Sequence, residues 1–300
     1  MIDRRQVLTA LSALPALGFA APAASAATAR LTSGISRGIA ALEARSGGRL
    51  GVSVLDTASG KTFAHRGDER FAMCSTFKTL VAGLVLKRVD QGLESLDRRI
   101  AYGRAVLVSN SPATEKHVGE GMTVGALCEA TMTLSDNAAA NLLLNTFGGP
   151  PAITAFARSL GDKVTRLDDY ETGLNAVRPG EVHDTTSPNA MLATLRALSL
   201  GTALSPASRQ RLVAWLVANQ TGDKRLRAGL PAGWKVGDKT GSWADGGRGT
   251  TNDIAVIWPN ERRQPLLITA YLHHSTLDND GCNAVIAEVA RLVVKAGFGS

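Results

Sequence analysis

The sequence predicts an α+β fold of two lobes, in which an antiparallel five-stranded sheet is flanked by terminal helices and a second lobe is all helical. Two observations lead to this fold class. Apolar patterns of period two lie near residues 51–65 and again between 234 and 272, whereas patterns of helical period lie between 75 and 218. Strands from both ends then join one sheet, with the helical block inserted. A functional cleft is expected between the lobes.

The composition is that of an ordinary globular protein. Of the 300 residues, 44% are hydrophobic and 20% charged, so wholesale disorder is excluded. Three cysteines cannot form a disulfide scaffold. The net charge of +7 is compatible with nucleic acid or an anionic envelope as partner. The basic residues are scattered and aromatic residues make up 5%, so no nucleic-acid partner is predicted.

Residues 1–26 have the three parts of an export signal in the right order. Arg4-Arg5 forms the charged head, an apolar stretch runs from Val7 to Ala20, and Ala24-Ser25-Ala26 is an A-x-A cleavage site. The arginine pair resembles a twin-arginine signal. The apolar stretch contains Pro15 and ends in small residues, so it does not predict a spanning helix. We therefore expect cleavage near Ala26 and a mature, periplasmic or secreted chain without a membrane segment.

The first predicted strand is Gly51–Asp56, and Gly60 turns the chain into a second near Phe63. A helix follows over Ser75–Val89, because its apolar residues form one stripe. Further helices are predicted at Val124–Thr133, Asp136–Phe147, Ala152–Leu160, Pro188–Leu200 and Pro206–Ala218.

Strands return after Gly233. They are predicted at Trp234–Lys239, Asp253–Trp258 and Leu266–Leu272, and a final helix is predicted from about Ala284 to Lys295. The α/β lobe is thus expected at about 27–70 and 220–300, and the helical lobe at about 71–219.

No periodic pattern is present between Thr165 and Ser187, a stretch with two glycines, a proline and seven charged residues. It is too long for a simple connector, so we predict a functional Ω-type loop at about 166–184.

The first chemical motif is Ser75-Thr-Phe-Lys78 at the start of a predicted helix. A spacing of three puts both side chains on one face, one turn apart. Serine alone is a poor nucleophile, and a neighbouring amine that loses its proton can activate it. The helix N-terminus adds free N–H groups for a developing oxyanion. The alternative is a capping serine beside an exposed lysine.

Two further motifs contain hydroxyl, amide and ammonium groups. Ser135-Asp136-Asn137 precedes a predicted helix, where it either caps the helix or supplies a proton relay and an amide for substrate. Lys239-Thr240-Gly241-Ser242 ends a predicted strand, where lysine and hydroxyl groups suit a substrate carboxylate.

A fourth pattern, Glu171-Thr-Gly-Leu-Asn175, lies within the Ω-type loop. A loop carboxylate beside a serine site can act as general base for water, and Asn175 could hold that water. The alternative is an exposed glutamate that faces solvent.

The order S-x-x-K, S-D-N and K-T-G is a known signature, and the three motifs together occur by chance at a level of about 0.002. With them, the chain resembles the class A serine β-lactamases across residues 30–298. Blocks such as Gly121-Met-Thr-Val, Leu230-Pro-Ala-Gly-Trp and Gly249-Thr-Thr-Asn-Asp also resemble that family. The implied fold is the β-lactamase/transpeptidase-like one.

The resemblance implies hydrolysis of the β-lactam ring of penicillins and cephalosporins through a serine acyl-enzyme, conferring resistance. The implied catalytic residues are Ser75, Lys78, Ser135, Glu171 and Lys239. The implied substrate-binding residues are Asn137, Asn175, Thr240, Ser242 and Arg225. The oxyanion hole is implied to be the backbone N–H groups of Ser75 and Ser242. No cofactor or metal is implied, and a monomer acting on a small molecule is expected.

Within that implied mechanism, Ser75 attacks the lactam carbonyl, and Lys78 and Glu171 share the base role for acylation, a disputed assignment. Glu171 with Asn175 activates the water that releases the acyl group. Ser135 passes a proton to the departing nitrogen with electrostatic support from Lys239. Asn137 holds the acylamido group, and the substrate carboxylate meets Thr240, Ser242 and Arg225.

The sequence departs from the family at three places. Asp169 stands where the family usually has an arginine that pairs with the loop aspartate, here Asp184, and two close carboxylates repel. Arg166, Arg178 and His183 are the possible substitutes, and a loop more mobile than usual is predicted. Asn110 replaces a common aromatic residue of the cleft. The segment Trp243–Arg248 is a few residues longer than usual, so the substrate spectrum stays open.

Other classes of function fit less well. A penicillin-binding D-Ala-D-Ala peptidase would share the serine and both lysines but lack a deacylating loop carboxylate such as Glu171. A non-turnover β-lactam sensor would usually lie beside membrane helices. An α/β-hydrolase would need G-x-S-x-G between a strand and a helix, and the one match, Gly34–Gly38, lies before the first predicted strand. A metallo-hydrolase needs clustered histidines, and His273 and His274, adjacent on a strand, are expected on opposite faces.

Overall fold

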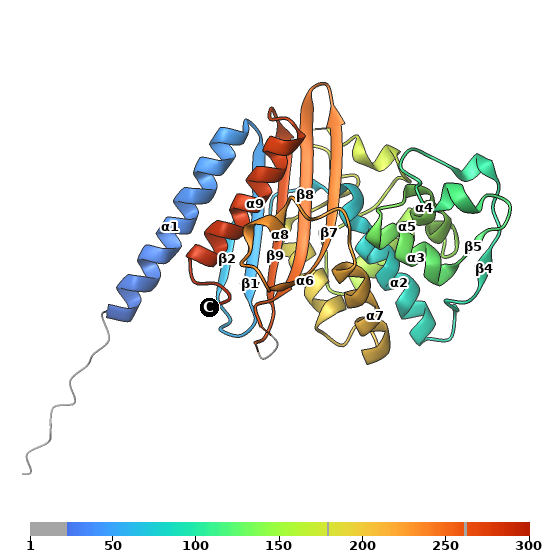
Figure 1. Ribbon diagram of the computed structural model, residues 1–300, viewed down its shortest axis with the longest axis horizontal. Coiled ribbons are helices and arrows are strands. Elements are labelled where there is room, and N and C mark those ends of the chain that lie inside the picture. The colour runs from blue at the N-terminus through green and yellow to red at the C-terminus, as the bar shows by residue number, and fades with distance from the viewer. Residues whose placement is uncertain (1–22, 179, 261–262) are drawn as a thin grey trace, which may run out of the picture.

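The computed structural model describes residues 23–178, 180–260 and 263–300, with side chains from residue 33 onward (Figure 1). Most of the predicted export signal, residues 1–22, lies outside the described residues. The main sheet is antiparallel with the order β2-β1-β9-β8-β7. Its strands are β1 (Arg49–Asp56), β2 (Thr62–His65), β7 (Lys235–Asp245), β8 (Arg248–Trp258) and β9 (Leu266–Ser275).

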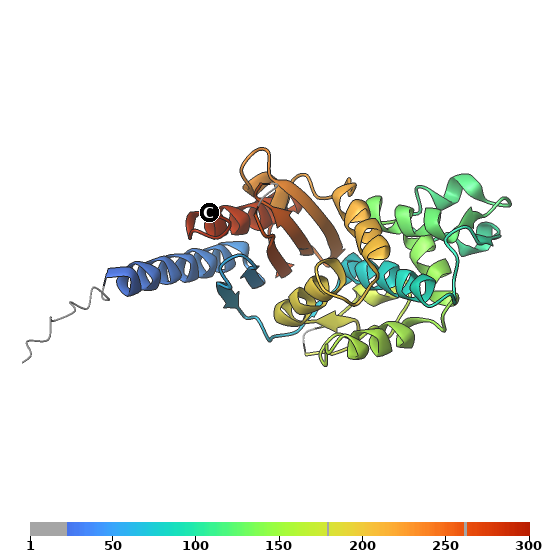
Figure 2. The ribbon, with the colours of Figure 1, turned by 90° about the horizontal axis from the view of Figure 1, so that it is seen from below.

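One face of this sheet is covered by the two terminal helices, α1 (Ala23–Ser46) and α9 (Asn279–Lys295), and by the short α8 (Leu226–Gly229) (Figures 1 and 2). An apolar stripe of each long helix packs on alternate residues of the strands. The buried members include Ile35, Ile39 and Leu42 of α1, Val285, Val289 and Val293 of α9, and Val52 and Val54 of β1.

The other face carries the helical part of the chain. Its helices are α2 (Lys78–Asp90), α3 (Val124–Thr133), α4 (Asn137–Asn145), α5 (Pro150–Ser159), α6 (Pro188–Ser199) and α7 (Pro206–Val217). Helices α6 and α7 pack on the sheet, and α2 contacts α3, α4, α5 and α7. Because α2 is surrounded, its first two turns are almost wholly buried.

Short elements connect these parts. The 3₁₀ turns are Cys74–Phe77, Arg104–Val106, Thr114–His117 and Gly173–Asn175. Two small ribbons pair β3 (Phe71–Ala72) with β6 (Thr185–Thr186) and β4 (Arg99–Ile100) with β5 (Met122–Thr123). The first of these ribbons ties the end of the predicted Ω-type loop to the segment before Ser75.

The predicted α+β class with its five-stranded antiparallel sheet is confirmed. The largest differences in element boundaries lie in the β7–β8 hairpin and at the start of the last helix. The β7–β8 hairpin is longer than expected, since the polar residues after Lys239 continue the ladder as far as Asp245 and Arg248. Helix α9 begins at Asn279 because Asp278 caps it by accepting a hydrogen bond from the Gly281 N–H.

The prediction that His273 and His274 lie on opposite faces is wrong. Their ring centroids are 4.4 Å apart. Residues Leu272 and Ser275 of β9 pair with Thr251 and Gly249 of β8, so two residues oppose one and form a bulge. His274 takes a φ of 55° there, and this left-handed conformation breaks the alternation of side chains.

Three further findings concern the cysteines, membrane-spanning helices and metal sites. Cys74, Cys128 and Cys282 are buried free thiols. Among the described residues, no helix combines the length and the apolar character needed to cross a membrane. No three His, Cys, Asp or Glu side chains gather in a metal-binding arrangement within the described part of the chain.

Candidate active site

Ser75 lies in the 3₁₀ turn that leads directly into α2, below the end of β7. The residue before it, Cys74, has a φ of 43°, an uncommon conformation for a residue other than glycine. The thiol of Cys74 is buried, and the buried environment raises its pKa, so it remains a neutral thiol at ordinary pH. Ser75 is therefore the candidate nucleophile of this turn.

The close packing around Gly241 explains why the Lys239-Thr240-Gly241 motif needs a glycine. A Cβ atom at this position would lie 2.8 Å from the Met73 carbonyl oxygen and 3.1 Å from the Ser75 nitrogen. Strand β7 can therefore approach the turn of Ser75 only when residue 241 has no side chain. This contact brings the backbone of the neighbouring Ser242 to the same end of the cleft.

The Lys78 ammonium lies at the centre of the site, one turn after Ser75. Its Nζ is 2.8 Å from Ser75 Oγ, 2.9 Å from the Ser135 carbonyl oxygen and 2.9 Å from Glu171 Oε1. It also donates to Asn137 Oδ1. Burial lowers the pKa of Lys78, and the carboxylate of Glu171 opposes that effect. A buried lysine with a lowered pKa can exchange a proton with the serine hydroxyl.

Ser135 joins the two buried lysines. Its Oγ lies 3.3 Å from Lys78 Nζ and 3.0 Å from Lys239 Nζ. Burial, followed by the positive charge of Lys78, lowers the pKa of Lys239 well below that of an ordinary lysine. Both lysines thus lie within hydrogen-bond distance of one hydroxyl, an arrangement that can relay a proton.

Asp136 holds this second motif in place. Its carboxylate caps α4 through the Ala139 N–H and accepts hydrogen bonds from the backbone N–H groups of Ala113 and Thr114. Ser135 beside it has a φ of 58°, a left-handed conformation. The two interpretations of this motif therefore hold together. Asp136 caps the helix, and Ser135 and Asn137 on either side of it line the site.

Glu171 reaches the site from the loop. Its Oε1 lies 3.3 Å from Ser75 Oγ, and its Oε2 accepts a 2.7 Å hydrogen bond from Asn175 Nδ2. The side chain is buried, so Glu171 does not face solvent. Asn175 Oδ1 is buried without a protein hydrogen-bond partner in the described part of the chain, so it can accept a hydrogen bond from water beside Glu171.

The sequence analysis missed Asn141. Its side chain donates to the Glu171 carbonyl oxygen and accepts from the Glu171 N–H, each at 2.9 Å. A residue of α4 thus fixes both backbone polar groups of the loop glutamate. The spacing of four from Asn137, which puts both amides on one face of a helix, was the signal that could have revealed it.

The loop around Glu171 also contains the unusual carboxylates. Asp184 Oδ1 accepts backbone hydrogen bonds from Asp168 and Asp169 at 2.8 and 3.0 Å. Arg166 pairs with Asp168 and not with Asp184. Burial raises the pKa of Asp184, and the nearby charges of Asp168 and Asp169 raise it further. The backbone N–H groups of Asp168 and Asp169 thus contact Asp184, the residue that the family arginine was expected to pair with. The greater mobility of this loop stays a prediction.

Arg225 is buried behind β7. Its guanidinium donates to the carbonyl oxygens of Gly241 and Asn252 at 2.9 and 2.7 Å, to Asn283 Oδ1 at 2.9 Å and to Ser242 Oγ. Burial lowers the pKa of Arg225. The Thr240 hydroxyl is hydrogen-bonded to that of Thr221. Arg225 therefore orients the Ser242 hydroxyl and links the neighbouring strands β7 and β8.

These groups surround one cavity of about 330 Å³. Eight of the ten predicted site residues line it: Ser75, Ser135, Asn137, Glu171, Asn175, Arg225, Thr240 and Ser242. Lys78 and Lys239 do not line the cavity, but the Nζ atoms of both lie within hydrogen-bond distance of Ser135 Oγ, which does. Asn110 also lines the cavity, and its Nδ2 donates to the Ser135 carbonyl oxygen. No predicted residue lies apart from the site.

Comparisons with known proteins show the family of this chain. A model described as "Beta-lactamase enzyme family" matches residues 34–296. Beta-lactamase FAR-1 of Nocardia farcinica is 51% identical over 257 residues, which cover 86% of this chain and 81% of that protein. Beta-lactamase L2 of Stenotrophomonas maltophilia is 49% identical over 283 residues, covering 93% and 92%. The solved structure of an ancestral (GNCA) class A beta-lactamase is 67% identical, with a TM-score of 0.84 and coverage of 87% and 99%.

Proposed function

This chain belongs to the β-lactamase enzyme family and is a class A serine β-lactamase that hydrolyses β-lactam antibiotics, and we propose the following roles for its residues. Ser75 Oγ attacks the lactam carbonyl and forms the acyl-enzyme. The observation that carries this proposal is the position of Ser75 Oγ, 2.8 Å from the Lys78 amine and 3.3 Å from the Glu171 carboxylate. A nucleophile within reach of a base is the requirement for covalent catalysis.

Lys78 and Glu171 share the removal of the serine proton. Lys78 Nζ and Glu171 Oε1 both lie within reach of Ser75 Oγ. The 2.9 Å contact between the amine and the carboxylate lets a proton pass from one to the other. The lowered pKa of Lys78 supports its neutral form as a base. Backbone N–H groups of Ser75 and Ser242 stabilise the developing oxyanion, a role supported by the close approach of β7 at Gly241.

Ser135 delivers a proton to the departing lactam nitrogen. Lys78 and Lys239, at 3.3 and 3.0 Å from its hydroxyl, supply and stabilise that proton. Asn137 binds the acylamido group of the substrate. Thr240, Ser242 and Arg225 meet the substrate carboxylate.

Deacylation uses Glu171 as general base for water. Its buried carboxylate and the unpartnered Asn175 Oδ1 support this role, because together they offer two acceptors to one water molecule. A D-Ala-D-Ala peptidase lacks such a carboxylate, and Glu171 with Asn175 therefore favours the lactamase over the peptidase.

The proposal is tested with a chromogenic cephalosporin and the purified mature protein. Sustained turnover at substrate in large excess over enzyme is expected, with a mass increase on the peptide that contains Ser75 in quenched samples. The Ser75→Ala variant should show neither signal. A single burst from the wild type would instead favour the sensor or the peptidase.

We also propose that the chain is cleaved near Ala26, exported by the twin-arginine route, and acts as a periplasmic or secreted monomer. The division into an α/β lobe at about 27–70 and 220–300 and a helical lobe at about 71–219 is part of the same proposal. The order of the signal elements supports the export route, and the run of helices α2 to α7 between residues 78 and 217 supports the helical lobe. The N-terminal mass of the exported protein and its mass in solution test it, and loss of export in an Arg4→Lys, Arg5→Lys variant tests the route.

A further inference from the structure

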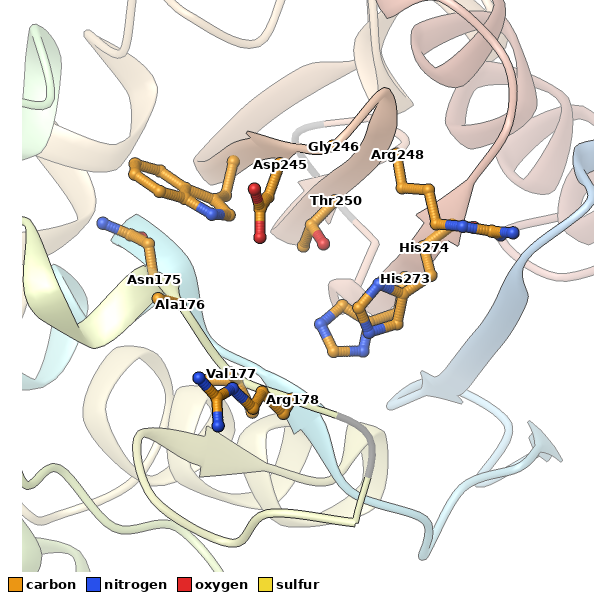
Figure 3. Close-up of a pocket in the computed structure, with 11 residues that line it drawn as sticks. Asn175, Ala176, Val177, Arg178, Asp245, Gly246, Arg248, Thr250, His273 and His274 are labelled. Carbon is orange, nitrogen blue, oxygen red and sulfur yellow. The ribbon is translucent and has the colours of Figure 1, made fainter.

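Asn110 is an exposed residue that lines the catalytic cavity, and the roles proposed above leave it without a function. A larger cavity of about 590 Å³ adjoins the catalytic one at Asn175 and Trp243, between the loop segment 175–178 and the β7–β8 hairpin (Figure 3). Asn110 is not among the described residues that line this larger cavity. A change of its side chain therefore alters the catalytic cavity and leaves the walls of the larger one intact.

The side chain of Asn110 contacts the backbone of the Ser135-Asp136-Asn137 motif. Its Nδ2 donates to the Ser135 carbonyl oxygen at 2.9 Å. Because a carbonyl oxygen only accepts hydrogen bonds, the Asn110 atom that faces it is the amide nitrogen. The same carbonyl oxygen accepts a 2.9 Å hydrogen bond from Lys78 Nζ. Two donors therefore share one acceptor, and one of the two is the amine proposed as acylation base.

Backbone contacts hold Asn110 against this motif. Its carbonyl oxygen accepts a 2.9 Å hydrogen bond from the Asn137 N–H, and the Ser109 carbonyl oxygen accepts a 2.8 Å hydrogen bond from Asn137 Nδ2. Asn110 has a φ of 59°, a left-handed conformation that asparagine adopts more readily than most residues. The segment is thus tied to the motif, and from it the Asn110 side chain reaches Ser135.

The protonation state of Lys78 decides how many acceptors its Nζ can satisfy. Three groups that only accept hydrogen bonds surround this atom: the Ser135 carbonyl oxygen, Asn137 Oδ1 and the Glu171 carboxylate. An ammonium group has three N–H bonds, one for each acceptor, whereas a neutral amine has two and turns its lone pair to the Ser75 hydroxyl. One acceptor then loses its donor, which favours the ammonium form. A second donor at the Ser135 carbonyl oxygen removes this cost, because that oxygen stays paired.

The titratable groups around Lys78 come from several elements. Burial, the largest effect, lowers the pKa of Lys78, whereas Glu171 of the loop and Asp136 before α4 raise it. Cys74 in the 3₁₀ turn is a neutral thiol, since burial raises its pKa. Lys239 of β7 is the second cation of the site. A neutral amide donor at the shared carbonyl oxygen acts in the same direction as burial and adds no charge of its own.

We propose that Asn110 is a positioning residue for acylation: by binding the Ser135 carbonyl oxygen, it favours the neutral form of Lys78 that serves as the base. This inference rests on the proposed function, in which Lys78 shares the removal of the Ser75 proton. The effect reaches the reacting atoms through Ser135 and Lys78.

The pH dependence of acylation tests this role in the Glu171→Gln variant, where the loop carboxylate is absent and Lys78 acts as base. The rate constant of the burst with a chromogenic cephalosporin is measured between pH 5 and 9, with and without Asn110→Leu. Leucine is similar in size and has no donor. The pKa of Lys78 should then rise by about half a pH unit to one pH unit, the size of one neutral hydrogen bond. Because acylation needs the neutral amine, it should be about three- to ten-fold slower at low pH and equal at high pH.

Two further variants separate the lost donor from other effects. Asn110→Asp keeps the shape of the side chain and suits the same left-handed backbone, but it places a negatively charged acceptor at the carbonyl oxygen. It should shift the pH profile in the same direction as leucine, and further. Asn145→Leu makes the same change at an exposed position of α4 and should leave the profile unchanged. Backbone strain from leucine would slow acylation equally at every pH.

The possible failures are distinguishable. A deficit that is equal at every pH, or a weaker substrate affinity with an unshifted profile, would overturn the positioning role, while a burst that labels Ser75 upholds the lactamase. The absence of a burst from Glu171→Gln at every pH would overturn the role of Lys78 and this inference with it. Sustained turnover by the wild type would uphold the lactamase in that case too, and its absence would overturn the proposed function itself.

Discussion

Lys78 and Glu171 form an ion pair of 2.9 Å whose side chains are 0% and 1% exposed. Because water is excluded from this pair, removal of one partner leaves the charge of the other buried and uncompensated. The remaining group then favours its neutral protonation state. The Ser75 hydroxyl is within hydrogen-bond distance of both partners. The ionisation of this pair therefore controls the nucleophile directly.

Arg225→Lys should weaken substrate binding. The guanidinium donates to four acceptors in a fixed geometry, and an ammonium cannot reach all of them. The loss of one charged hydrogen bond, of about 1.5 kcal/mol, should lower kcat/KM about ten-fold, mainly through KM. Steady-state kinetics with benzylpenicillin measure it. Lys224→Gln, which removes an exposed ion pair next in sequence, serves as the control. An unchanged KM would contradict the carboxylate-binding role.

Gly241→Ala should impair both stability and acylation. The added methyl group would meet the Met73 carbonyl oxygen at 2.8 Å, so β7 must move away from the turn of Ser75. We expect a loss of about 1–3 kcal/mol in the free energy of unfolding, typical of overpacking, together with a lower acylation rate. Urea unfolding and stopped-flow acylation measure the two effects. Gly103→Ala, where a Cβ has open space, is the control. Acylation at the wild-type rate would show that this contact does not build the oxyanion hole.

Asp169→Asn should stabilise the protein at neutral pH. The pKa of Asp184 is raised in the folded state, by burial first and then by its acidic neighbours. A group with a raised folded pKa gives a stability contribution that is complete below its unfolded pKa and is lost as pH rises through the folded pKa. Removal of the Asp169 charge reduces that loss. The expected gain at pH 7 is about 0.5 kcal/mol or less, because Asp169 is exposed.

Urea unfolding across pH 3–8 tests this prediction. The gain should vanish below about pH 4, where the carboxylates are protonated. Asp97→Asn, another exposed aspartate, should show no gain. A variant less stable than the wild type at pH 7 would mean that Asp169 supports the loop.

The loop itself is expected to exchange its amide hydrogens faster than the sheet. Among the described residues of this loop, 166–178 and 180–184, the 3₁₀ turn Gly173–Asn175 is the one regular element, and burial of Asp184 among acidic groups weakens the native state there. Hydrogen exchange followed by mass spectrometry measures this directly. Protection in residues 166–184 equal to that of β8 would show that the backbone hydrogen bonds to Asp184 replace the arginine pair fully.

The sequence predicted the elements that have strong local patterns. The helix predicted at Val124–Thr133 has those bounds in the structure, because its apolar face and its capping Thr123 are local signals. The strand predicted at Trp234–Lys239 was expected to end there, since the polar residues beyond Lys239 carry no apolar alternation. Pairing with β8, a long-range interaction, extends it to Asp245.

The site was predictable residue by residue only where motifs exist. Lys78, Ser135 and Lys239 lie far apart in the chain, and only the fold brings the Ser135 hydroxyl within hydrogen-bond distance of both lysines. Asn141 was missed because its role is to bind backbone atoms of a distant loop. The prediction that the side chains of His273 and His274 lie on opposite faces of the sheet was wrong because a bulge depends on pairing between strands.

The central claim is that Lys78 and Glu171 share the acylation base, whereas Glu171 alone serves deacylation. Glu171→Gln removes the carboxylate that raises the pKa of Lys78, so the amine 2.8 Å from Ser75 becomes neutral more readily. Acylation should persist, and deacylation should fall by about 10²–10⁴, the usual contribution of a general base. Glu129→Gln, at an exposed position of α3, is the matched control and should turn over normally.

The most direct measurement is therefore the burst of chromogenic cephalosporin hydrolysis by Glu171→Gln. The account predicts one equivalent of product per enzyme, with the acyl group retained on Ser75, followed by near-complete arrest. Sustained turnover would contradict the deacylating role of Glu171, and the absence of any burst would contradict the share of Lys78 in acylation.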